Sequence, residues 1–195
     1  MSDDPGWKDT WKGVPLAFVP QLALIRAKRT SGANGVNGLT ALRTVFVSFC
    51  GALVLVGLVV QMLGDRIGVE PPTAATVAIV VALGCASLVV VKLWSRSLDG
   101  TSDATLSSGY RVRFFVRMAV SEAVALSSFA LSIALGPWWL YYVSLPFAFA
   151  GFWMNAPTRA HLAQDQDELS LAGCQRSLVD ALSGAGATGA YPLAR

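Results

Sequence analysis

The chain has 195 residues, of which 54% are hydrophobic and 14% are charged, and its net charge is +3. Soluble globular domains carry about 25% charged residues, so this composition excludes that class and indicates an integral membrane protein. We expect no nucleic-acid partner. Eleven Arg against four Lys, with abundant Ala, Val and Leu, favour a GC-rich, actinobacterial-type source.

Residues 1–43 form a predicted N-terminal segment on the cytoplasmic side. Its apolar run, Val14–Ile25, is interrupted by prolines and is too short to span about 30 Å of hydrocarbon. Trp7 and Trp11 lie one helical turn apart and each precedes a lysine, which is typical of a segment lying at the lipid headgroups. Packing of this segment on the helix bundle is the alternative, and the sequence leaves both open.

Residues 44–154 are predicted to form a transmembrane domain of four helices, arranged as two hairpins, so the fold class is all-α. The four spans are Thr44–Leu63, Thr73–Val91, a third within Tyr110–Gly136, and Trp138–Met154. Pro137 suits the first turn of the fourth span, and Pro146 should bend that span midway.

The distribution of basic residues predicts the topology. Fourteen of the fifteen Lys and Arg residues lie before the first span, between the second and third, or after the fourth. Cytoplasmic loops of membrane proteins are enriched in Lys and Arg, so both termini and the central loop should be cytoplasmic, in a bacterial inner membrane. All six tryptophans lie near predicted interfaces, which supports the same boundaries.

Residues 155–195 form a polar tail in which Pro157–Leu171 is predicted to be an amphipathic cytoplasmic helix. One side of this helix carries Leu162, Gln166 and Leu169. The residues expected to face water are Asp165, Asp167 and Glu168.

Glu122 is the only acidic side chain within the long apolar runs. A carboxylate there costs several kcal/mol unless it is protonated, paired or close to the headgroups, so it is a candidate proton or partner site. Arg117 lies roughly 140° around the same helix and is poorly placed to neutralise it. A partner should therefore come from another helix or another chain, although a purely structural role is the alternative.

The residues around Glu122 resemble a known helix. Phe114-Phe115, followed by Glu122-Ala123 and by an apolar run that ends near Gly136-Pro137, is similar to the ion-carrying helix of actinobacterial ATP synthase subunit c. The resemblance covers this one helix, and it implies that Glu122 is protonatable.

Small side chains form two ridges along predicted spans. The third span carries Ser121, Ala125, Ser128 and Ser132 at helical spacing, and the second carries Ala75, Ala78, Ala82 and Cys85. Such ridges let helices approach closely, so we expect the two ridges to pack together. The ridge of the third span is also a candidate docking interface for another protein.

Three arginines precede the third span, namely Arg111, Arg113 and Arg117. Arginines at a helix end reach toward lipid phosphates, so we expect contacts with lipid headgroups.

The sequence predicts no catalytic, cofactor or metal site. The three cysteines lack the spacing of a metal site, and Asp165 is the only second ligand at helical spacing from His161. A non-catalytic accessory subunit fits best, one that docks on a larger inner-membrane complex, such as a multisubunit lipid importer or an energy-converting complex, and stabilises or regulates it. The alternatives are a proton-binding, subunit c-like proteolipid acting as an oligomer, and a small transporter.

Overall fold

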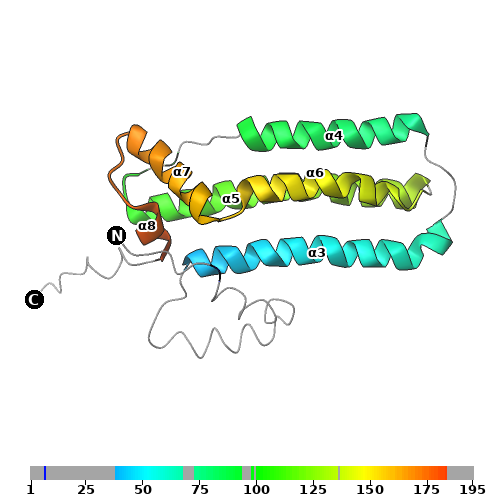
Figure 1. Ribbon diagram of the computed structural model, residues 1–195, viewed down its shortest axis with the longest axis horizontal. Helices are drawn as coiled ribbons and strands as arrows, with labels where there is room; N and C mark the ends of the chain where they lie inside the picture. Colours follow the sequence, from blue (N-terminus) through cyan, green and yellow to red (C-terminus); the bar gives the residue numbers. More distant parts are fainter. Residues whose placement is uncertain are drawn as a thin grey trace, which may run out of the picture. The chain divides into compact units, whose positions relative to one another are not determined.

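The computed structural model describes Trp7 and residues 38–67, 73–93, 98, 100–135 and 137–183. All regular secondary structure in this part of the chain is helical, which confirms the all-α class (Figure 1). The helices are α3 (Gly38–Ile67), α4 (Ala74–Leu93), α5 (Asp103–Leu135), α6 (Leu140–Asn155), α7 (Arg159–Leu171) and α8 (Leu178–Ser183).

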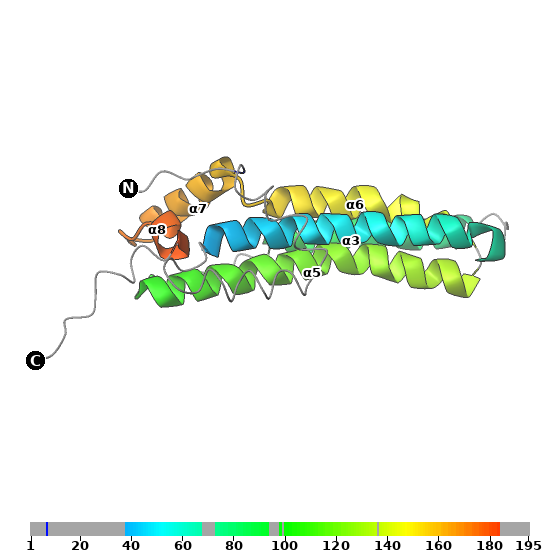
Figure 2. The same ribbon diagram turned by 90° about the horizontal axis from the view of Figure 1, so that it is seen from below.

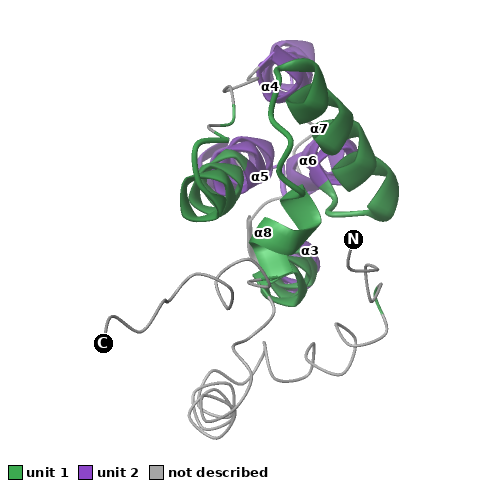
Figure 3. Cartoon of the chain, turned by 90° about the vertical axis from the view of Figure 1, so that its left-hand side faces the viewer, with its two compact units in different colours: residues 1–48, 97–113, 156–195 green, residues 49–96, 114–155 purple. Residues whose placement is uncertain are grey.

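The chain divides into two compact units (Figure 3). Unit 1 comprises residues 1–48, 97–113 and 156–195, and unit 2 comprises residues 49–96 and 114–155. The N-terminal parts of α3 and α5 therefore belong to unit 1 with α7 and α8, whereas their C-terminal parts belong to unit 2 with α4 and α6.

Within the described residues, three helices are long and apolar enough to cross a membrane, as expected of a membrane protein. They correspond to Gly38–Gly64, Ala74–Leu93 and Asp103–Leu135. Helix α6 has 16 residues, about 24 Å at 1.5 Å per residue, and is shorter than the roughly 30 Å of a hydrocarbon core. It begins only after the turn at Trp138 and Trp139, later than the predicted fourth span.

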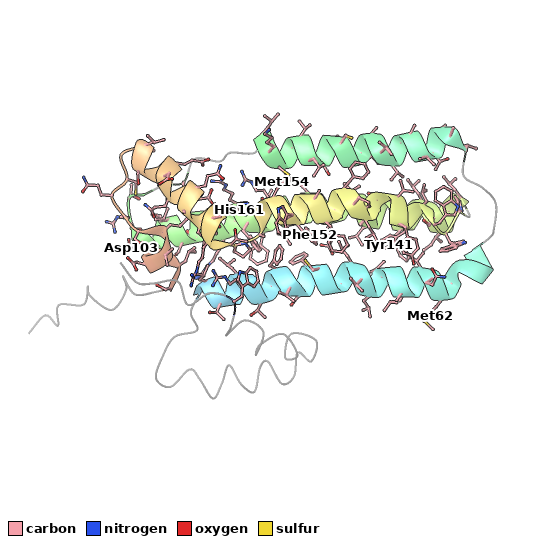
Figure 4. The ribbon with its side chains drawn as sticks, in the orientation of Figure 1. Met62, Asp103, Tyr141, Phe152, Met154 and His161 are labelled. Carbon is pink, nitrogen blue, oxygen red and sulfur yellow. The ribbon has the colours of Figure 1, made fainter. Side chains whose placement is uncertain are left out.

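Helix α6 runs alongside α3, α4 and α5 in unit 2 (Figures 1 and 2). Its Tyr141 hydroxyl donates to the Leu53 carbonyl of α3 at 2.7 Å. Nearer the other end of α6, the Phe152 ring meets Phe49 of α3 edge to face, with ring centroids 6.3 Å apart. Figure 4 shows Tyr141 and Phe152 turned toward α3, whereas Met62 points outward.

Glycines permit the close approach of α6 to its other two neighbours. A Cβ atom at Gly84 of α4 would lie 2.7 Å from ring carbons of Phe147. A Cβ atom at Gly151 of α6 would lie 2.8 Å from the Cβ of Ser121 on α5. Real Cβ atoms do not come so close to such atoms, so both contacts require glycine.

The face of α4 that packs on the bundle differs from the prediction. Its buried residues are Val80, Gly84, Ser87 and Val91. The predicted ridge of Ala75, Ala78, Ala82 and Cys85 is exposed, so its expected packing against α5 is wrong. Gly84 removes more side-chain volume than any alanine, and it admits the Phe147 ring on the opposite side of α4.

Unit 1 contains the predicted amphipathic helix as α7. The Thr158 hydroxyl caps its first turn by accepting a hydrogen bond from the His161 amide at 3.3 Å. Leu162 and Leu169 are buried, as the amphipathic pattern predicts. The Gln166 side chain accepts from the Leu178 amide at 2.7 Å and donates to the Arg176 carbonyl at 3.0 Å, which fixes α8 to α7.

Candidate functional site

Glu122 lies on α5, half-buried, at the surface of unit 2. It makes no hydrogen bond or ion pair with any residue that the structure describes. It lies 13 positions before Leu135, where α5 ends, which corresponds to about 20 Å along the helix. The carboxyl group therefore lies well inside the apolar part of α5.

The surface of α5 around Glu122 is apolar and outward-facing. Phe115 is 43% exposed and Leu126 is 44% exposed, and Ala119 and Ala123 are also exposed. Phe115, Ala119, Glu122 and Leu126 follow the i, i+4, i+7, i+11 spacing of a single helix stripe. We refer to these four residues together with Ala123 as the Glu122 face.

The predicted small-residue ridge lies on the inward side of α5. Ser121, Ala125, Ser128 and Ser132 are all at most 1% exposed. Each serine hydroxyl donates to the backbone carbonyl four residues earlier, at 2.8–2.9 Å, so its hydrogen bond is satisfied within α5. Packing inside unit 2 thus accounts for the ridge, and no part of it is open to a second protein.

The three arginines at the start of the third span have different surroundings. Arg113 is 7% exposed, and its guanidinium forms an ion pair with Asp165 of α7 at 3.0 Å. Glu168 lies 3.9 Å from the same nitrogen. Arg111 is exposed and Arg117 is half-buried. The Arg113 guanidinium therefore binds α7 within unit 1. Asp165 was predicted to face water, but it faces this arginine.

Arg43, the residue before the predicted first span, is fully buried within α3. Its Nε donates to the Pro157 carbonyl at 3.2 Å. The Trp7 ring lies under the guanidinium, with 5.3 Å from Cζ to the ring centroid, and meets Phe46 edge to face. Trp7 is the one described residue before Gly38, and it packs on α3.

A third arginine joins α5 to the segment between α7 and α8. Arg176 Nη1 lies 2.7 Å from Asp103 Oδ1, at the start of α5. The contacts of Arg43, Arg113 and Arg176 thus tie together the N-terminal part of α3, the N-terminal part of α5 and the tail. The only sequence signal for this arrangement was the prediction that all three segments lie at the cytoplasmic side of the membrane.

His161 does not face a cluster of potential ligands. Its Nδ1 lies 2.8 Å from the Ala156 carbonyl oxygen. Among the residues whose placement is described, no three His, Cys, Asp or Glu side chains lie close enough to hold a metal ion.

Comparisons of this chain with protein families, with curated proteins and with solved structures found no match. The candidate site is therefore defined by its own geometry.

Proposed function

We propose that this chain is a non-catalytic accessory subunit that docks on a larger complex of a bacterial inner membrane and stabilises or regulates it. In this proposal the chain crosses the membrane four times, with both termini cytoplasmic. The three long apolar helices support membrane insertion, and the asymmetric distribution of basic residues supports the orientation.

The position of tryptophans on and beside α6 supports its role as the fourth span. Trp139, just before α6, is 37% exposed, and Trp153, near its end, is 73% exposed. They are 14 residues apart, about 21 Å along a helix. Exposed tryptophans near both ends of a helix are typical of membrane interfaces, and the turns that flank α6 would supply the remaining length of the span.

The observation that carries the docking proposal is the half-exposed Glu122 in an apolar face. Within the described residues nothing compensates this carboxyl, and a carboxylate facing lipid is costly. A neighbouring protein that covers the Glu122 face removes this cost. Accessory docking therefore explains a carboxyl group that the described part of the chain leaves without a partner.

A proton-binding proteolipid would also use an outward-facing Glu122. Such a protein acts as a homo-oligomer, whereas an accessory subunit accompanies different chains. Stoichiometry therefore separates the two functions.

The test is purification of the tagged full-length chain from its native membrane in a mild detergent, with subunits identified and counted by mass spectrometry. A different tagged inner-membrane protein, expressed at the same level, is the control for non-specific recovery. We expect one copy of this chain with larger, unrelated membrane subunits. A ring of this chain alone would establish the proteolipid, and recovery of a solitary monomer would refute both functions.

A further inference from the structure

We propose that the Glu122 face binds a transmembrane helix of another protein and that this helix presents a lysine or arginine side chain to Glu122. The inference rests on the proposed accessory function and specifies the chemistry of the partner. It follows from three features of α5: which of its faces is covered, where its carboxyl lies, and which side chains surround that carboxyl.

The described part of the chain covers one face of α5 and leaves the other open. Ser121, Ala125 and Ser128 are buried in unit 2, whereas Phe115 and Leu126 are each more than 40% exposed. Within the described residues, the Glu122 face is therefore free for a neighbour.

The carboxyl group on this face has no counter-charge in the described chain. Arg117, the nearest arginine before it on α5, is five residues away and about 140° around the helix. A lysine or arginine at the level of Glu122 would satisfy the carboxylate and would itself be neutralised, which is how ionisable residues persist inside membranes. Charge complementarity thus selects a basic partner helix over lipid chains.

The shape of the face fits a long basic side chain. Ala119 and Ala123 flank Glu122 and are small and exposed, whereas Phe115 and Leu126 stand above and below along the stripe. A lysine or arginine that reaches across the alanines would meet the carboxylate between these two larger side chains. The bulky residues would then define the register of the partner helix.

A second copy of this chain is disfavoured as the occupant. Two copies joined symmetrically through the Glu122 face would bring two carboxyl groups together, and like charges at short range oppose each other. A symmetric second copy thus supplies no positive group at the level of Glu122, and a basic helix of a different protein does.

The test uses the full-length chain in its native membrane, with photo-reactive benzoylphenylalanine in place of Ala119 or, as the control, in place of Ile79. Ile79 is 54% exposed on α4 and lies outside the Glu122 face. We expect the probe at position 119 to cross-link to a helix of another protein that carries Lys or Arg within one turn of the linked residue. Cross-links from position 119 only to lipid or to this chain, or to a helix without a basic residue, would overturn the proposal.

Charge substitution supplies an independent measurement. Glu122→Lys should lower the partner recovered per copy of this chain by about tenfold or more, because it places two cations together. Glu122→Gln should lower the recovery of the partner less than Glu122→Lys does. When the partner's basic residue is replaced by Glu, recovery of the partner with the Glu122→Lys chain should be restored. Wild-type recovery with Glu122→Lys would reject the ion pair. If the Glu122→Lys protein does not accumulate, partner recovery with Glu122→Gln and the cross-link from position 119 test the ion pair instead.

The two proposals fail differently. If large subunits co-purify with the wild-type chain but neither cross-linking nor charge substitution involves Glu122, the accessory function stands and only the basic partner helix is wrong. If nothing co-purifies with the wild-type chain, the accessory function itself is wrong.

Discussion

The hydroxyl of Tyr141 on α6 donates a hydrogen bond to the backbone carbonyl of Leu53 on α3, 88 residues earlier in the chain, at 2.7 Å. The next residue does the same one turn further along α3, where the Tyr142 hydroxyl donates to the Gly57 carbonyl at 2.8 Å. A carbonyl oxygen has two lone pairs, so each can accept this bond in addition to its helical one. Tyr141 therefore attaches α6 to α3 through a backbone carbonyl alone, whereas the Tyr142 hydroxyl also lies 3.2 Å from Oε1 of Gln61 on α3.

Removing the first of these bonds should weaken unit 2. Tyr141 is fully buried, so Tyr141→Phe should lower the free energy of unfolding by about 1 kcal/mol, in the range of interhelical hydrogen bonds in membranes. The measurement is unfolding from mild detergent into dodecyl sulfate, followed by tryptophan fluorescence. Tyr142→Phe is the matched variant and should cost less, because Tyr142 is only half-buried. Equal stability of Tyr141→Phe and wild type would contradict the bond.

The ion pair between Arg113 and Asp165 should hold α7 in unit 1. These side chains are 9% and 16% exposed, so Asp165→Asn should cost about 1–3 kcal/mol, between the values for surface pairs and fully buried pairs. Limited proteolysis should then cut residues 156–183 faster than in wild type. Asp167→Asn, at an exposed position of the same helix, should leave the rate unchanged.

A charge swap tests whether this effect is electrostatic. Arg113→Asp combined with Asp165→Arg should recover part of the protection lost in Asp165→Asn. If the double variant is not protected from proteolysis and Asp165→Asn is cut at the wild-type rate, α7 is held by its apolar residues alone.

Gly84 should be essential for the packing of α4 on α6. In Gly84→Ala the new Cβ would meet the Phe147 ring, and overpacking costs about 1–3 kcal/mol. The higher helix propensity of alanine stabilises the folded state by at most about 1 kcal/mol. The free energy of unfolding should therefore decrease in the same assay. Ala82→Leu, on the exposed face of α4, is the control and should have little effect. Phe147→Leu should rescue Gly84→Ala if the contact is the cause.

The four-span topology predicts which positions can be reached from outside the cell. Single cysteines are placed at Gly68, Ser102 and Thr188 in a chain whose native Cys50, Cys85 and Cys174 are replaced by alanine; Gly68 and Thr188 lie outside the described residues. An impermeant maleimide should label only position 68 in intact cells and all three after permeabilisation. Labelling of position 102 in intact cells would rule out this topology.

The helical type and the central parts of α3 and α4 could be predicted from the sequence, whereas α3 and α5 begin earlier, at Gly38 and Asp103, than the predicted spans. Thr44–Leu63 and Thr73–Val91 lie within α3 and α4, apart from the first residue of the second span, because long uncharged runs have no other stable form in a bilayer. Leu162 and Leu169 identified the buried side of α7, because that helix is polar on its other faces and its pattern is therefore readable. The acidic residue in an apolar run, Glu122, was likewise visible without a structure.

Which helix faces meet was decided only by the tertiary structure. Apolar residues surround α4 on every side, so its sequence contains no periodicity that separates Gly84, which contacts Phe147, from Ala78 and Ala82, which are exposed. The roles of the charged residues were hidden for a different reason. Arg113 finds Asp165 across 52 residues of sequence, and only the folded chain brings such distant groups close enough to neutralise each other.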